Sequence, residues 1–362
     1  MIHFVFFPLH PFFESFLQFK VFTFSSTAKI IFDSLISFGF LSKIFFVSSL
    51  AAVLFVAIDI IYQFIFGQDI FGFEGSGRRL GGPFGDELIA GGFLQKFSFF
   101  LFFLLATSPF FKKFSSRKLL VLFLFSSAII TFGFLFAGNR VPFMMFFLTS
   151  ILIFIFFKNK RIYFLSIIIS VISIFYIMYN SNLEIAKHYG HAYIKAKDIV
   201  TPFSEKNLIN NDKFEKLDKS SDQTNYSIKF KNKNYLMNNA HILQFYSGYL
   251  TWSEKKIFGG GVKTYRYNCP KVMINCTTHP HNYYLEILTD LGIVGLLIIS
   301  FIFVYLIYIS IFNKAVMASP FFYIFISEIF PFKSTGSFFT TSNSTFIFLI
   351  LSILASLSLK KN

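Results

Sequence analysis

Long apolar runs recur along this chain and constrain its fold more than any other feature. Each run is about 16 to 23 residues long and ends at charged residues or at Gly and Pro, which is the length a helix needs to cross a bilayer. Backbone groups in lipid must bond internally, so such runs form α-helices. A soluble protein has no interior that could hide a chain that is 54% hydrophobic and contains 59 phenylalanines. The sequence therefore predicts an all-α polytopic membrane protein.

The predicted transmembrane helices can be placed by these runs. Segment 1–43 is apolar but interrupted by prolines and charges, and we expect it to form a partial or truncated span. With it, the total is about eight to ten spans around one large loop domain. Beyond this segment, eight runs have spanning length, residues 44–66, 93–111, 119–137, 141–157, 162–179, 283–312, 317–330 and 345–359.

The basic residues indicate the orientation in the membrane. The net charge is +15, which by itself would suggest a nucleic-acid partner. However, many of the lysines and arginines cluster in short loops near 112–118 and 158–161 and at the C-terminus, as is typical of the cytoplasmic side. We therefore predict that the protein interacts with membrane lipid and not with nucleic acid. Loop 67–92, between the spans of 44–179, and the large loop 180–282, before the C-terminal spans of 283–362, then lie on the other side.

Both cysteines, Cys269 and Cys276, lie in the large loop. An extracytoplasmic location makes a disulfide between them plausible, and two free thiols are the alternative.

Arg140 stands between two apolar helices, just before Pro142, which suits the first turn of the next helix. A helix N-terminus favours an anion, and a guanidinium is well suited to binding phosphate. The sequence thus makes Arg140 a candidate phosphate ligand, with a snorkelling interfacial arginine as the alternative.

His279 and His281 flank Pro280 at the end of the large loop. Their spacing does not suit a pair of metal ligands, and no Cys/His/Asp set completes a zinc site, so we predict no metal. One histidine is a candidate general base, while Asn282 is a candidate N-cap for the next helix. Glu286 lies near the N-terminus of the expected helix, where the dipole stabilises an acidic side chain. The alternative role is to orient a histidine.

Three glycines, residues 259–261, precede Lys263 and Arg266. The segment is not a P-loop, because it lacks the Lys-Ser/Thr pair and the strand–loop–helix frame. It is either a phosphate-binding element or a solvated basic loop.

Taken together, several segments resemble the O-antigen ligase/polymerase superfamily of bacterial inner-membrane proteins. Residues 279–295, HPHNYYLEILTDLGIVG, are similar to the signature that ends the family's large periplasmic loop. Residues 257–266 resemble its Gly-x-Gly element and 138–140 its Ser/Gly-x-Arg element. Residues 59–87 and 330–339 resemble the first loop and last hairpin of ligases. Family members usually have ten to twelve spans, so this chain is short by one or two.

The resemblance implies a GT-C-type glycosyltransferase with no cofactor and no metal, whose active site faces the periplasm. The donor would be a glycan on undecaprenyl diphosphate, and the acceptor lipid A-core or another glycan. His281 would be the catalytic base, and Arg140 would stabilise the leaving diphosphate. The substrate-binding candidates are Arg79, His241, Lys263, Arg266, His279, Asn282 and Glu286.

The sequence is also compatible with three other functions. An O-antigen repeat-unit polymerase and a protein O-oligosaccharyltransferase belong to the same class of enzyme. A membrane transporter belongs to another class, but transporters usually place charges at mid-span, whereas here the charges gather at one membrane face.

Overall fold

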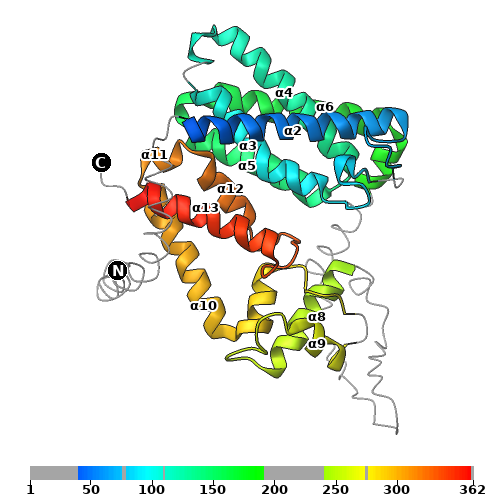
Figure 1. Ribbon diagram of the computed structural model, residues 1–362, viewed down its shortest axis with the longest axis vertical. Helices are drawn as coiled ribbons and strands as arrows, with labels where there is room; N and C mark the ends of the chain where they lie inside the picture. Colours follow the sequence, from blue (N-terminus) through cyan, green and yellow to red (C-terminus); the bar gives the residue numbers. More distant parts are fainter. Residues whose placement is uncertain (1–39, 76–78, 109–110, 191–239, 274–275, 360–362) are drawn as a thin grey trace, which may run out of the picture.

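The computed structural model describes residues 40–75, 79–108, 111–190, 240–273 and 276–359. Within these residues the chain is all-helical, without a β-strand (Figure 1). Most of the expected N-terminal segment 1–43 and the central part of the large loop, 191–239, lie outside the described residues.

Five long helices pack into the first bundle, and phenylalanine fills it. Phe99 and Phe102 of α3, Phe123 of α4 and Phe146 of α5 are fully buried, and their rings lie at stacking or tilted distances from one another. Such ring pairs add stabilisation beyond the burial of their area. The helices are α2 (Phe40–Phe66), α3 (Ala90–Thr107), α4 (Ser116–Ala137), α5 (Arg140–Phe156) and α6 (Arg161–Ser181).

The C-terminal helices form the second part. α12 packs against α3 and α5 of the bundle and against α13, while α10 contacts α13 and α8. Their bounds are α10 (Tyr283–Ile311), α11 (Lys314–Met317), α12 (Pro320–Glu328) and α13 (Thr341–Leu359). The small helices α8 (Ala240–Glu254) and α9 (Tyr265–Asn268) lie beside the start of α10, at the lower right of Figure 1.

Six described helices are long and apolar enough to cross a membrane, and α5 is a shorter apolar helix of 17 residues. The described residues therefore do not reach the expected eight to ten spans. The expected span at 317–330 is the clearest difference. Met317 ends the four-residue α11, and the helix within 317–330 is the nine-residue α12, which rises only about 14 Å, less than half the hydrocarbon thickness.

Alternating helix directions bring one set of loops to the same end of the molecule. The 67–89 loop, the 138–140 turn, the start of α10 and the 329–340 hairpin lie at this end, whereas the basic loops near 112 and 158 lie at the other. The segregation of basic loops expected from the sequence is thus present in the fold.

Candidate active site

The start of α10 is fixed by Asn282. Its side-chain oxygen accepts hydrogen bonds from the backbone N–H groups of Tyr284 and Leu285, at 3.0 and 3.2 Å, so it is the N-cap that the sequence predicted. The preceding residue, His281, has a φ of 52°. A left-handed conformation is uncommon for a residue with a side chain and is found at functional sites. Here it turns the chain sharply from the loop into the helix.

The imidazole rings of His279 and His281, just before the start of α10, lie close to each other. The ring centroids of His279 and His281 are 4.3 Å apart. Burial first, and then the neighbouring His281 ring, lower the pKa of His279 to about 4, against the opposing effect of the Thr335 backbone. Burial also lowers the pKa of His281. Both rings are therefore neutral near pH 7 and able to accept a proton. Within the described part of the chain, the buried Nε2 atom of His279 has no hydrogen-bond partner.

The 329–340 hairpin closes against the same segment. The Thr335 N–H donates to the His281 carbonyl at 2.9 Å, and the Asn282 side-chain amide donates to the Pro331 carbonyl at 2.7 Å. Further along α10, the Glu286 carboxylate accepts from the Ser337 hydroxyl and the Phe338 N–H, each at 2.5 Å. Glu286 is buried, and these contacts show that it anchors the hairpin.

A buried ion pair ties this hairpin to the helical bundle. Lys333 Nζ lies 2.9 Å from Glu328 Oε1, and both side chains are almost fully buried. Gln95 of α3 donates to Glu328 at 3.0 Å and to Ser327 at 2.9 Å. Buried charges need such partners, because removing them from water is costly.

Asp290 and Gly292 organise the glycine-rich segment. Asp290 accepts hydrogen bonds from the N–H groups of Lys263, at 2.5 Å, and of Tyr265, at 3.3 Å. Gly292 interrupts α10 with φ 69° and ψ −168°. A Cβ at this position would lie 2.1 Å from the Ile257 carbonyl oxygen, so only glycine lets the two backbones meet.

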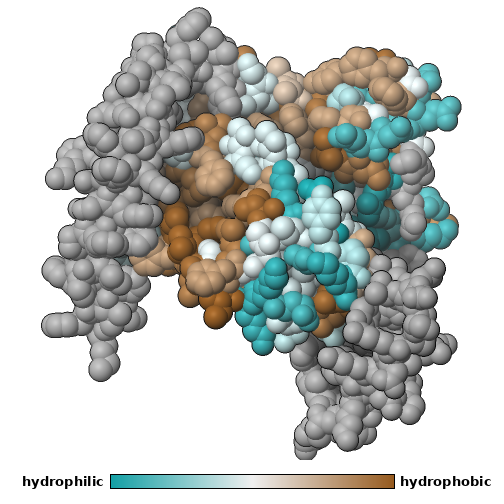
Figure 2. Space-filling model, turned by 60° about the horizontal axis from the view of Figure 1, so that its bottom comes forward, coloured by the Kyte–Doolittle hydropathy of each residue, from teal (hydrophilic) through white to brown (hydrophobic). Residues whose placement is uncertain are grey.

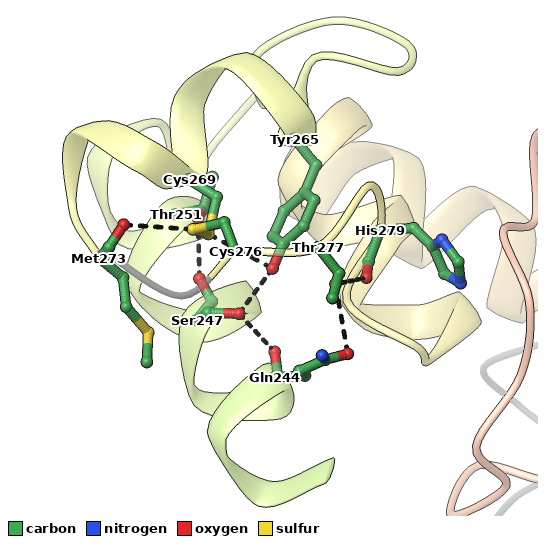
Figure 3. The surroundings of a disulfide bond; sticks show 9 residues. All are labelled: Gln244, Ser247, Thr251, Tyr265, Cys269, Met273, Cys276, Thr277 and His279. Atoms are coloured by element: carbon green, nitrogen blue, oxygen red, sulfur yellow. Dashed lines mark hydrogen bonds between the residues drawn. A yellow bond between two sulfur atoms is a disulfide. The ribbon is translucent and has the colours of Figure 1, made fainter. Parts of the chain in front are cut away.

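Cys269 and Cys276 form a disulfide in the loop that leads to His279 (Figure 3). Cys269 is fully buried, and the Tyr265 hydroxyl lies 3.4 Å from its sulfur and 2.6 Å from Ser247 Oγ. Just after the disulfide, Thr277 Oγ1 donates to the His279 carbonyl at 2.6 Å. The crosslinked loop thereby leads directly into the histidine pair.

Arg140 begins α5, and its guanidinium donates to the carbonyl oxygen of His188 and lies 3.3 Å from His188 Nδ1. The other ring nitrogen of His188, Nε2, lies 2.9 Å from the Gly138 carbonyl. A carbonyl only accepts and a guanidinium only donates, so Nε2 carries the proton and Nδ1 is the acceptor. Neutral His188 therefore connects the two sides of the 138–140 turn.

The first loop packs on the same turn. Asn139 donates to the Leu88 carbonyl at 3.2 Å and accepts from the Gly91 N–H at 3.1 Å. At the other end of the loop, the Ile70 N–H donates to the Asp59 carboxylate of α2 at 2.9 Å. The loop therefore joins the end of α2 to the start of α5.

No hydrogen bond described above joins the other predicted substrate-binding side chains to the histidine pair. Arg79, Lys263 and Arg266 are exposed, and the side chain of His241, at the start of α8, is not among those described. Residues that the sequence reading missed include His188, Lys333 and Thr335. A buried histidine and a buried lysine have no local signal, because their partners are distant in sequence. In the described part of the chain, no group of three or more His, Cys, Asp or Glu residues is arranged to hold a metal ion.

Comparison with protein families identifies the relationship. A family model described as O-Antigen ligase matches residues 121–300. The chain belongs to the O-antigen ligase-like superfamily. None of the curated proteins and none of the solved structures compared with the chain matches it.

The resemblance seen in the sequence is thus confirmed for this O-antigen ligase-like protein, whose family consists of membrane glycosyltransferase-like enzymes acting on lipid-linked glycans. The match spans Arg140, the disulfide and both histidines. It ends at residue 300, before the 329–340 hairpin whose contacts complete the site.

Proposed function

We propose that this multi-pass membrane protein transfers a glycan from undecaprenyl diphosphate to lipid A-core at the periplasmic face of the bacterial inner membrane. The observation that carries the proposal is the pair of neutral imidazoles, His279 and His281, at the start of a membrane-spanning helix. A neutral imidazole is a suitable proton acceptor for a sugar hydroxyl.

In this proposal His281 is the base. The acceptor oxygen attacks the anomeric carbon and forms the new glycosidic bond, while its proton passes to the imidazole. The bond between the anomeric carbon and the phosphate oxygen breaks with its electron pair, so a single displacement inverts the anomeric centre. Asn282 and Thr335 support the base, because both tie the chain at His281 and its next residue to the last hairpin.

Arg140 is the proposed electrostatic partner of the leaving diphosphate, whose charge increases as the bond breaks. Its position at the start of α5 supports this role, since the helix N-terminus also favours an anion. His188 orients the guanidinium. Arg79, His241, Lys263 and Arg266 are the candidates for a second cation. With fixed cations in these roles, the proposed reaction needs no divalent metal.

The test is a deletion strain complemented with wild type, His281→Ala or Arg140→Ala, with membrane expression verified and lipopolysaccharide separated on gels. Both variants should leave core without O-chain and accumulate lipid-linked polymer. Arg161→Ala is a matched control, because this arginine begins α6, next to the basic loop near 158 at the opposite end of the bundle. Full transfer by both site variants would refute the assignment.

The same gels separate the alternatives. Core carrying a single repeat unit in the deletion strain would identify a polymerase, and unchanged lipopolysaccharide with loss of a glycoprotein would identify a protein O-oligosaccharyltransferase. A His279→Ala variant tests the choice of base, since complete loss there with activity retained in His281→Ala would assign the proton transfer to His279.

A further inference from the structure

The chain from the end of α8 through α9 to Lys271 exposes apolar and basic side chains together. Phe258 is 76% exposed and Tyr267 is 68% exposed, and Ile257 and Val262 are also exposed. Between residues 254 and 271 the one acidic residue is Glu254, and all the other charged residues are basic. Its exposed cations are Lys255, Lys256, Lys263, Arg266 and Lys271. A cluster of large apolar side chains with basic neighbours is unfavourable in water and is typical of a contact surface.

The backbone fixes the level of this segment along α10. The Ile293 N–H donates to the Lys256 carbonyl at 2.9 Å, and the Gly261 N–H donates to the Asp290 carbonyl at 2.8 Å. Both bonds lie next to Gly292, where α10 is interrupted. The segment and the interruption therefore share one level in the membrane.

That level can be estimated from the length of the helix. Residues 293–311, after the interruption, rise about 28 Å, close to the hydrocarbon thickness of about 30 Å. Gly292 then lies near the boundary between acyl chains and headgroups. Leu297 and Ile298, one turn further along, are exposed and face the lipid in this placement. Figure 2, with the bottom of the molecule turned forward, shows hydrophobic and hydrophilic residues side by side on this face.

We propose that residues 254–267 are seated in the headgroup layer of an anionic bilayer. Ile257, Phe258 and Val262 would enter the acyl boundary, and the three lysines and Arg266 would pair with lipid phosphates. Tyr267 and the nearby Trp252 have the amphipathic rings that favour this layer. The proposal does not rest on the proposed reaction, because it concerns only where the α8–α9 segment lies.

The chain carries its own probe for this contact. Trp252 is the single tryptophan, and its indole N–H donates to the Lys256 carbonyl at 3.0 Å. The full chain would be reconstituted in nanodiscs of brominated phosphatidylcholine and phosphatidylglycerol. Bromine near the headgroup end of the acyl chain should quench Trp252 by about half, and more strongly than bromine near the methyl end, whereas aqueous iodide should quench it weakly.

Matched variants test the role of the segment. Phe258→Ser combined with Val262→Ser should reduce quenching by lipid and increase quenching by iodide. Phe312→Ser, which removes an equally exposed phenylalanine at the other end of α10, should change neither. Replacing Lys255 and Lys256 by Gln should remove the dependence of the quenching on phosphatidylglycerol.

Two results would overturn the proposal. Strong iodide quenching with no effect of brominated lipid would place the segment in water. Protection of Trp252 from both quenchers would indicate a protein neighbour, such as a second copy of the chain. Either result leaves the glycan-transfer proposal intact, because that proposal is tested on gels with different variants.

Discussion

Thr335 donates its backbone N–H to the carbonyl oxygen of His281 at 2.9 Å, although the two residues belong to different loops. The candidate base is therefore held from both sides, by the N-cap of α10 and by the last hairpin.

Asn282 serves both as the cap of α10 and as a link to the hairpin. Asn282→Ala should destabilise the protein by about 1–2 kcal/mol through loss of the cap, and should abolish transfer. Asn282→Asp keeps the capping oxygen but removes the donor to Pro331. We therefore expect Asp to retain thermal stability better than Ala while still losing transfer. Equal stability of the two variants would show that the cap contributes little.

The Glu328–Lys333 pair should behave as a unit. Lys333→Met alone leaves a buried carboxylate without its cation and should cost about 3–5 kcal/mol, whereas Lys333→Met with Glu328→Gln should cost much less. Thermal unfolding of the purified single and double variants in detergent measures this coupling. Additive losses would mean that the two charges do not interact.

Gly292 should tolerate no side chain. Gly292→Ala places a methyl group against the Ile257 carbonyl in a left-handed backbone conformation, so we expect a loss of about 3 kcal/mol or more. Gly92→Ala is the matched control, because no atom lies within 4 Å of the added methyl group and its helical backbone suits alanine. The control should unfold at the wild-type temperature or slightly above it. Similar behaviour of the two variants would contradict the described kink.

The histidine pair predicts the acid dependence of stability and activity. Both folded-state pKa values lie below the ordinary 6.5, that of His279 at about 4, so the unfolded chain binds more protons between these values. Stability from these groups is then present above pH 6.5 and is lost as the pH falls toward 4. His279→Gln should flatten this part of a pH series of unfolding temperatures. Transfer should decline only below pH 6.5, and a decline beginning above it would argue against a neutral imidazole base.

The disulfide should stabilise the loop before the histidines. Replacing Cys269 and Cys276 together by Ser should cost about 2 kcal/mol, as expected for a short crosslinked loop. Reductant should lower the unfolding temperature of wild type and leave the double variant unchanged. Sensitivity of the double variant to reductant would assign the effect elsewhere.

The sequence by itself determined the features that depend on local pattern. Lipid-length apolar runs predicted the long helices, and Asn282 before an apolar run predicted the start of α10. Clustered lysines and arginines predicted which loops share an end of the molecule. These predictions hold because hydrogen bonding within a helix and the cost of burying charge act over short stretches of chain.

Only the tertiary structure decided which apolar residues meet protein and which meet lipid. Phe322, Tyr323 and Phe325 made residues 317–330 resemble a span, yet they are buried against other helices, because hydropathy does not distinguish a protein core from a bilayer. The sequence also could not predict which residues far apart in the chain contact each other. Arg140 and His188 are 48 residues apart, and Glu286 and Ser337 are 51 apart, so their contacts form only when the helices pack.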